Sequence, residues 1–442
     1  MEVFKMKTNN SKNKAKAFLG AAFMLLIAFM FTACPQKAKP KAEEPPPGPQ
    51  KVTFSVEGGN GELKAMAGST EITSGKKVPY GTTVTFTATV TAAEHCVDEW
   101  TITGGSFKAG GKDGDTTATV QITGETEVKV NFSRYKSVAF GTNGADLAEY
   151  LNTGTAASDG TYYIKVTALQ AEHLKGNSAT YEASPLAKIL QAHQAKKVAL
   201  KFGKLPAVTD INSCFRECKN LTQAPMLPAG VTNMESCFYN CEGLTQTPEI
   251  PESVTNMRNC FNGCKNLTQI SHFPANAKVT NMNGCFVECE SLTQVPALPA
   301  SVTDITNCFS KCKNLTQAPE IPASVTQMSG CFKECLELTQ APPAIPKGVT
   351  NLHYCFFNCR KLTKAPVIPK GVTYMKYCFK FCGELTEVTL ECNYVNNNFD
   401  EAFFSCDKLT AGTIKVPAGQ LSAYQAGADD MGTEADRFVA AP

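Results

Sequence analysis

The stretch CFRECKNLTQAP, Cys214–Pro225, decides the fold, because near-copies of it follow one another down the chain. The first cysteines of the copies are 23 to 25 residues apart: Cys214, Cys237, Cys260, Cys285, Cys308, Cys331, Cys355 and Cys378. A second cysteine follows each at four residues: Cys218, Cys241, Cys264, Cys289, Cys312, Cys335, Cys359 and Cys382. AFFSC at Ala402–Cys406 is a ninth, degenerate copy. A unit this short cannot bury its own apolar face but a stack can, so the spacing predicts a solenoid.

The unit reads V-T-x-M-x-x-C-F-x-x-C-x-x-L-T-Q-x-P-x-x-P. Its period and its CF-x-x-C-x-x-L core resemble the BspA-type leucine-rich repeat of bacterial surface lipoproteins, treponemal ones especially, over residues 208–410. The resemblance implies a short parallel strand plus a helical or turn segment in each coil, with the leucine beginning the strand. This chain departs from the family by placing cysteine where alanine is usual. It also has a proline three or four residues after the leucine, which should limit each strand to about three residues.

The paired cysteines could be metal ligands, redox or catalytic thiols, disulfides or core residues. Zinc needs four convergent ligands and no histidine lies beside the pairs, so no metal site is predicted. Cys-x-x-Cys, the usual redox spacing, is absent, and catalytic thiols would not recur in sixteen near-identical copies. Packing as small apolar residues is favoured, and Ala402 fills the first slot in the ninth copy. Disulfides between stacked coils stay open, as does a separate Cys392–Cys406 pair.

The N-terminus reads as a lipoprotein signal peptide over residues 1–33. Lysines precede an apolar run at Ala17–Phe31, which is too short for a comfortable membrane span and ends in FTAC. Small residues before a cysteine resemble the bacterial lipobox, which implies lipidation of Cys34 and anchoring to the cell envelope, with the outer membrane and cell surface expected. An ordinary secretory signal is the alternative. The proline-rich residues 34–50 predict an extended tether.

Residues 51–135 predict a small all-β domain. Alternating, β-branched runs at Val52–Val56, Thr83–Val90, Thr117–Ile122 and Glu127–Phe132 are separated by glycine-rich turns. SGKKVPYGTTVTFTATV, Ser74–Val90, followed by Trp100, resembles the divergent internalin-type B-repeat of bacterial surface proteins.

The segments on either side of the repeats predict caps for the ends of the stack. Residues 136–207 combine helical stretches at Gly144–Leu151 and Ser184–His193 with strands at Tyr162–Val166 and Lys197–Phe202. Ser184 is a favourable N-cap followed by Pro185. Residues 411–442 resemble the strand-then-helix ending of the repeat family.

Composition and motifs argue against catalysis and nucleic-acid binding. Lysine and arginine number 42 against 40 acidic residues, a net charge of +2, so no nucleic-acid partner is expected. The five histidines are scattered and none lies in a nucleophile or metal motif. We therefore predict no enzyme, no catalytic residue and no cofactor.

Ligand-binding information should lie where the repeats differ, because the uniform Thr-Gln columns are interpreted first as structural hydrogen bonding. Residues 346–382 contain seven basic residues and no Asp or Glu, and aromatic residues crowd among them. The candidate ligand surface is His353, Tyr354, Phe357, Arg360, Lys361, Lys364, Lys370, Tyr374, Lys376, Tyr377, Lys380 and Phe381. Stacking predicts Tyr354 beside Tyr377 and Lys361 beside Glu384. Such a surface suits a sulfated glycan, an acidic protein patch or anionic lipid, whereas a solvated basic face is the plainer alternative.

These patterns predict a lipid-anchored surface protein with a non-catalytic binding or adhesion role. The resemblance implies host extracellular matrix proteins, acidic glycans or other bacterial surface proteins as partners. A structural lipoprotein that faces the periplasm and has no host ligand is the alternative.

Overall fold

The computed structural model describes residues 47–441. The predicted signal peptide, Cys34 and nearly all of the tether lie outside the described residues. Within residues 47–441, no helix is long and apolar enough to cross a bilayer.

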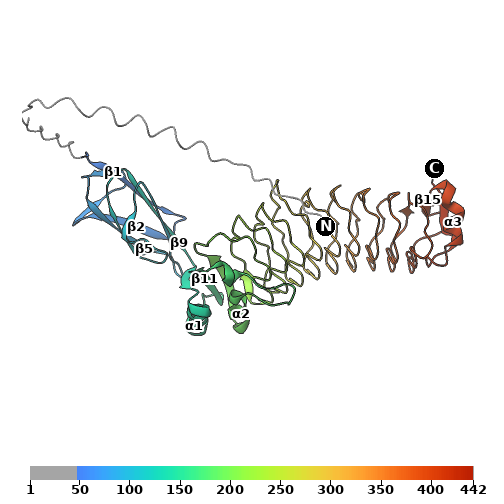
Figure 1. The fold of residues 1–442 in the computed structure, drawn as a ribbon, viewed down its shortest axis with the longest axis horizontal. Coiled ribbons are helices and arrows are strands. Elements are labelled where there is room, and N and C mark those ends of the chain that lie inside the picture. Colours follow the sequence, from blue (N-terminus) through green and yellow to red (C-terminus); the bar gives the residue numbers. More distant parts are fainter. Residues whose placement is uncertain (1–46, 442) are drawn as a thin grey trace, which may run out of the picture. The chain divides into compact units, whose positions relative to one another are not determined.

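Two β-sheets precede the repeats (Figure 1). One has the order β4-β1-β9-β6, formed by Lys76–Val78, Gln50–Glu57, Thr126–Ser133 and Cys96–Thr103. The other has the order β3-β2-β5-β8-β7, formed by Thr70–Ile72, Gly61–Ala67, Thr83–Val90, Thr117–Gln121 and Phe107–Gly110. The four predicted strands correspond to β1, β5, β8 and β9. Their inward side chains form a core of their own that includes Phe86 and Trp100.

A parallel sheet of order β10-β11-β12-β13 leads into the repeats. Its strands are Lys136–Ala139, Thr161–Thr167, Lys197–Phe202 and Leu221–Gln223, and β13 belongs to the first coil. The helices are α1, Ala145–Thr153, and α2, Pro185–Ala192, with the 3₁₀ turns η1, Thr142–Gly144, and η2, Ala171–Leu174. Ser184 Oγ caps α2 by accepting from the Ala187 N–H at 3.0 Å, and it donates to the Cys214 carbonyl at 2.6 Å. The N-cap of α2 therefore also ties this segment to the first coil.

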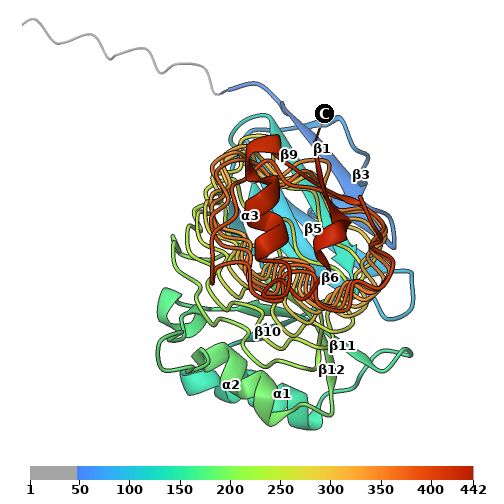
Figure 2. The same ribbon diagram turned by 90° about the vertical axis from the view of Figure 1, so that its right-hand side faces the viewer.

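The repeats stack as successive coils that overlie one another when viewed from the C-terminal end (Figure 2). The cysteine-bearing half of each coil consists of turns rather than helix. Single parallel bridges join equivalent residues, as in Asn233↔Asn256 and Gln317↔Gln340. A three-residue strand forms in the first coil, as β13, and most other coils keep only single bridges, so the strands are shorter than expected. The prolines explain this, because they cannot donate to a ladder.

The far end of the stack carries a second small sheet of order β14-β15-β16, formed by Val388–Thr389, Ile414–Val416 and Phe438–Ala440. Helix α3, Leu421–Ala426, lies between β15 and β16 with η3, Ala418–Gln420, and η4, Ala435–Arg437. The expected strand and helix are present, and β16 adds a strand that was not expected.

A column of phenylalanine rings runs through the interior of the coils. Its members are Phe215, Phe238, Phe261, Phe286, Phe309, Phe332, Phe356, Phe379 and Phe403, all fully buried. Neighbouring ring centroids are 5.1 to 5.9 Å apart and the rings are nearly parallel. Each coil therefore buries its phenylalanine only against the coils above and below it.

The cysteines are free thiols throughout the described part of the chain, and all but Cys96 are buried. The Cys392–Cys406 disulfide that the sequence left open does not form: both thiols are free, Cys392 Sγ lies 3.4 Å from the Tyr424 hydroxyl, and Cys406 Sγ donates to the Phe379 carbonyl. Burial raises the pKa of Cys241 and Cys289 well above the ordinary value, and that of Cys406 to about 12. These thiols therefore keep their protons near neutral pH.

The second cysteine of each coil is more than a small apolar residue. From Cys241 onward its Sγ donates to the phenylalanine carbonyl of the preceding coil, at 2.9 Å for Cys241 and 3.2 Å for Cys289. The same bond recurs in Cys264, Cys312, Cys335, Cys359, Cys382 and Cys406 at 3.0 to 3.1 Å. Each of these carbonyls also accepts the backbone N–H three residues ahead, as Phe261 does from Cys264 at 3.1 Å, so the S–H group is a second donor that ties neighbouring coils together.

We predict that the two cysteines of one coil respond differently to alanine. Cys289→Ala should lower the free energy of unfolding by about 1 kcal/mol more than Cys285→Ala, because it removes the S–H···O bond between coils and leaves the Phe261 carbonyl with the Cys264 N–H alone. Cys285→Ala is the matched control, since Ala402 fills the equivalent slot naturally. Urea unfolding of both variants measures the difference, and equal losses would contradict the assigned role.

Thiol titration without reductant tests whether the cysteines are free and buried. In denaturant all 19 described cysteines should react, whereas in the native protein Cys96 should be the only fast one among them. A shortfall in denaturant would show disulfides.

A buried charge cluster joins β6 to β11. Lys165 Nζ lies 2.9 Å from Asp98 Oδ1 and 3.0 Å from Asp113 Oδ2, and Lys201 Nζ lies 3.2 Å from Asp98 Oδ2. Asp98 is 4% exposed and Lys165 6%. Burial alone would raise the pKa of Asp98, but hydrogen bonding and charge from Lys165, with the charge of Lys201, leave it below its usual value.

We predict that Asp98→Asn lowers the free energy of unfolding by about 3 kcal/mol at neutral pH, because Lys165 loses its closest counter-charge. The depressed pKa of Asp98 means that its contribution is present above pH ~4 and is lost as the pH falls through the folded value. The difference between wild type and variant should therefore shrink in acid. Thermal unfolding from pH 3 to pH 7 measures it, with Lys188→Met at the exposed Lys188–Glu182 pair as control. A pH-independent difference would contradict the assignment.

Candidate ligand-binding surface

Each coil holds two residues in the left-handed region, immediately before its first and second cysteines. The arrangement turns alternate N–H groups toward the next coil: Ser236, Phe238 and Asn240 donate to the carbonyls of Arg258, Cys260 and Asn262 at 2.8, 2.8 and 2.7 Å. Before the first cysteine the φ values are 51 to 62° in Ser213, Ser236, Asn259, Gly284, Asn307 and Gly330. This conformation costs most L-residues about 1–2 kcal/mol, and least for glycine and asparagine.

Aromatic residues occupy these left-handed positions in the seventh and eighth coils. Tyr354 has a φ of 55°, Tyr377 of 59° and Phe381 of 67°. Tyr374 departs from a second rule of the repeat. Its equivalents Asn351 and Asp304 accept the N–H two residues ahead, at 2.9 and 2.8 Å, which a tyrosine side chain cannot do in the same way. Residues held where the backbone disfavours them point to a role outside folding.

The aromatic residues that depart from the repeat pattern lie together with other aromatic residues on one surface, which we call the aromatic patch. Its members are His353, Tyr354, Phe357, Tyr374, Tyr377, Phe381 and Phe404. Tyr354 and Tyr377 stack with centroids 4.8 Å apart, which confirms the expected neighbours. His353 contacts Tyr374 at 5.4 Å. A second row runs Phe357, Phe381, Phe404 with centroids 5.6 and 5.8 Å apart. The sequence prediction omitted Phe404, although aligning AFFSC with CFFNC places it one coil above Lys380.

Lysines lie over the rings of the aromatic patch. Lys333 Nζ is 5.2 Å from the Tyr354 centroid, Lys376 Nζ is 5.3 Å from Tyr377, and Lys380 Nζ is 4.6 Å from Phe404. Burial, together with the charges of Lys376 and Lys333, lowers the pKa of His353. His353 is therefore neutral near pH 7.

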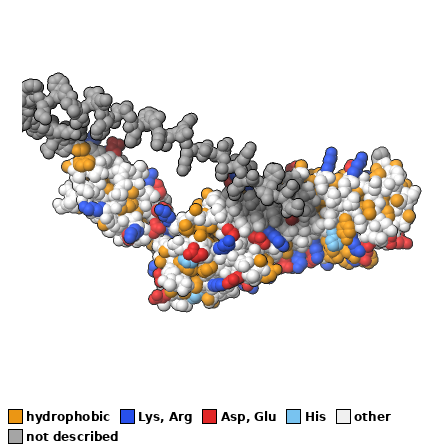
Figure 3. Space-filling model, viewed as in Figure 1, with side chains coloured by type: hydrophobic (Ala, Val, Ile, Leu, Met, Phe, Trp, Pro, Cys, Tyr) orange, Lys and Arg blue, Asp and Glu red, His pale blue; other side chains and the backbone are white. Residues whose placement is uncertain are grey.

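Neighbouring coils neutralise most of the basic residues, which the sequence window alone did not reveal. Lys361 pairs with Glu337 at 2.5 Å, Lys364 with Glu387 at 2.7 Å and Lys376 with Asp400 at 2.7 Å. Lys380 pairs with Glu401. On the face in Figure 3, blue and red side chains are interspersed over the coils. The surface is therefore aromatic in character rather than strongly basic.

The predicted basic residues do not all join the aromatic patch. Lys364 lies in the bridge column between Gln340 and Glu387, on the other half of the coil. Lys370 is exposed and forms no ion pair with any described residue. Lys361 lies between Glu337 and Glu384 in a column of alternating charge, and Glu384 pairs with Lys408.

The Thr-Gln columns are structural, as expected. Thr268 Oγ1 donates to the Thr245 carbonyl at 3.0 Å, and Thr339 Oγ1 to that of Thr316 at 3.1 Å.

A groove of about 490 Å³ adjoins the aromatic patch. Phe357 and Phe381 line it together with Asn358, Arg360, Gly383, Ser405 and Asp407. Arg360 Nε donates to Asn358 Oδ1 at 2.9 Å. Of these residues the sequence prediction included Phe357, Arg360 and Phe381. It omitted Asn358 and Gly383, which are neither basic nor aromatic, and Ser405 and Asp407, which belong to the ninth coil.

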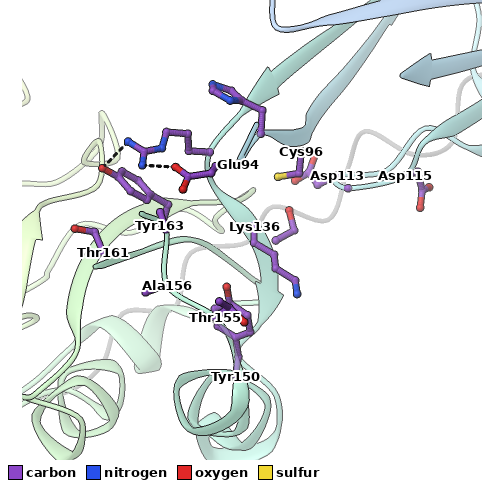
Figure 4. Close-up of a pocket in the computed structure, with 15 residues that line it drawn as sticks. Glu94, Cys96, Asp113, Asp115, Lys136, Tyr150, Thr155, Ala156, Thr161 and Tyr163 are labelled. Carbon is purple, nitrogen blue, oxygen red and sulfur yellow. Dashed lines mark hydrogen bonds and ion pairs between the residues drawn. The ribbon is translucent and has the colours of Figure 1, made fainter. Parts of the chain in front are cut away.

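A larger hollow, of about 590 Å³, lies between β6 and the α/β segment (Figure 4). Arg134 donates to Tyr163 Oη at 3.1 Å and to Glu94 Oε2 at 2.9 Å across its rim. The Tyr163 hydroxyl, which donates at 2.8 Å, is the main cause that lowers the pKa of Asp159 to about 2. Burial raises the pKa of Cys96, whose Sγ donates to the Tyr135 carbonyl at 3.0 Å. The polar groups around this hollow bond mainly to one another, which favours a structural role for them.

The chain belongs to the BspA-type leucine-rich repeat family. The family model matches residues 200–316 and 306–424, which together span 200–424, or 225 of 442 residues.

The solved structures that match the chain include bacterial leucine-rich repeat proteins. A leucine-rich repeat protein of T. pallidum is 21% identical, with 55% of this chain and 86% of that chain covered and a TM-score of 0.30. A leucine-rich cell surface protein of Faecalibacterium prausnitzii is 18% identical, with 61% and 94% covered and a TM-score of 0.28. No curated protein matches the sequence.

We predict that asparagine can replace the patch tyrosines at little cost. Tyr354→Asn and Tyr377→Asn lose ring stacking but relieve the left-handed backbone, so the free energy of unfolding should change by less than about 1 kcal/mol. The reverse changes, Asn259→Tyr and Asn307→Tyr, should destabilise by about 1 kcal/mol, because they add the backbone cost without a ring partner. Urea unfolding measures all four. Losses for the tyrosine variants as large as that of Phe356→Ala, about 3–5 kcal/mol, would show that the rings are structural.

Proposed function

We propose that the protein is a non-catalytic binding or adhesion protein, held at the cell envelope by a lipid on Cys34, which displays its repeats on the cell surface. Host matrix proteins, glycans and other bacterial surface proteins are the partner classes. Membership of the BspA-type family supports a binding role.

The observation that carries this proposal is the set of aromatic residues at Tyr354, Tyr377 and Phe381. Four of the other seven residues in the Tyr354–Tyr377 column are asparagine or glycine, which fold the same coil with less backbone cost, and the remaining three are the polar residues Ser213, Ser236 and Glu401. The rings lie partly exposed beside one another, and Phe381 and Phe404 are 38% and 42% exposed. Clustered aromatic residues with partial exposure are the composition of binding hot spots.

Charge contributes less than the sequence predicted. Lys361 and Lys364 form exposed ion pairs away from the rings, whereas Lys376 and Lys380 lie over them. A partner recognised through the aromatic patch therefore depends on the rings and on Lys376 and Lys380, and little on Lys361 or Lys364.

The test is a screen of the full chain, immobilised through its N-terminus, against purified matrix proteins, sulfated and neutral glycans and anionic vesicles. Any partner found should bind at least about tenfold more weakly to the triple variant Tyr354→Asn, Tyr377→Asn, Phe381→Asn. The charge-reversal variant Lys361→Glu, Lys364→Glu is the matched control and should bind as wild type.

Two results would overturn the proposal. Loss of binding in the control but not in the aromatic variant would move the site off the patch. Protection of the repeats from protease on intact cells, with no partner in the screen, would favour the structural lipoprotein that faces the periplasm.

A further inference from the structure

The groove beside the aromatic patch arises from one missing side chain. The residue after each second cysteine forms a column: Lys219, Glu242, Lys265, Glu290, Lys313, Leu336, Arg360, Gly383 and Asp407. In the first five coils the charges alternate and pair across coils, as in Lys219–Glu242 at 3.1 Å and Lys313–Glu290 at 2.9 Å. Gly383 is the single member without a side chain.

The gap at Gly383 leaves its two neighbours apart. A Cβ at Gly383 would have open space around it, with Asp407 Oδ2 at 3.9 Å the nearest atom. Arg360 and Asp407 lie two coils apart, about 10 Å if each coil advances by one strand spacing. Neither forms an ion pair within residues 47–441. The gap therefore holds a cation on one side and a carboxylate on the other.

Phe357 and Phe381 provide apolar surface at the same groove. Asn358 and Ser405 add further polar groups. The groove thus combines ring surface with hydrogen-bond donors and acceptors, and its charges balance.

We propose that this groove binds an uncharged saccharide, an inference that rests on the proposed binding function and names its ligand class. Sugar C–H faces pack on aromatic rings, and each hydroxyl both donates and accepts, so Arg360 and Asp407 are complementary to it. A charged group would be attracted by one of Arg360 and Asp407 and repelled by the other, so the balanced pair gives no net preference for a charged ligand. A volume of about 490 Å³ lies in the range of small-ligand sites.

The deciding variant fills the gap. Gly383→Leu places a side chain that the same column already tolerates at Leu336, and Gly383 does not have a positive φ, so the coil should fold unchanged. Leu336→Ala is the control, since it alters the same column two coils away. Circular dichroism and the unfolding midpoint check that both variants fold.

The experiment probes the full chain on an array of neutral and sulfated glycans, followed by calorimetry with maltoheptaose, chitohexaose, mannan and heparin. Binding to at least one neutral glycan is expected, with affinity reduced about tenfold or more by Gly383→Leu and by Arg360→Ala, and unchanged by Leu336→Ala. Binding to heparin alone, binding to no neutral glycan, or neutral-glycan binding unaffected by Gly383→Leu would overturn the proposal.

The experiments distinguish failure of the proposed binding function from failure of the saccharide site. A protein or peptide partner that the Tyr354/Tyr377/Phe381 variant abolishes and Gly383→Leu does not would leave the binding function standing while the saccharide site falls. Neutral-glycan binding that Gly383→Leu abolishes and the double variant Tyr354→Asn, Tyr377→Asn leaves intact would place the ligand in the groove and not on the two stacked tyrosines; Phe381 is kept in this variant because it lines the groove.

Discussion

Every feature of the repeat region depends on one constraint: a coil of about 23 residues cannot bury its phenylalanine, leucine and cysteines by itself. The apolar side chains reach full burial only between the coils above and below. The polar backbone follows the same rule, because alternate N–H groups donate to the next coil and cysteine S–H groups donate to the preceding one. Stability is therefore shared between neighbours, and each position in the coil has a fixed chemical requirement.

Because the requirements are fixed, departures from them stand out. Ala402 shows that sulfur is dispensable at the first cysteine, whereas the hydrogen bond of the second gives a reason for cysteine there in the second to ninth copies. Tyr354, Tyr377 and Phe381 place aromatic side chains on left-handed backbone, which costs free energy. Gly383 leaves a gap in a column of side chains. These departures lie within three coils, which is where the protein differs from a uniform stack.

The sequence predicted the coils, the buried cysteines and the contact of Tyr354 with Tyr377, because strict repetition turns spacing along the chain into neighbours in space. It overestimated the basic surface, since a window free of Asp and Glu says nothing about Glu337, Glu387, Asp400 and Glu401 on flanking coils. The thiol donors, the left-handed positions and the groove at Gly383 depend on backbone conformation, which residue spacing does not specify. The internalin-type resemblance of residues 51–135 and lipidation of Cys34 stay predictions.

Hydrogen–deuterium exchange of the full chain, with and without the ligand found by screening, tests the central claim most directly: the repeats are a uniform scaffold whose recognition surface lies where they depart from it. We predict that the ligand slows exchange in peptides covering residues 351–360, 374–383 and 401–407 and nowhere else in the stack. Protection along the Thr-Gln columns of the earlier coils would contradict the account.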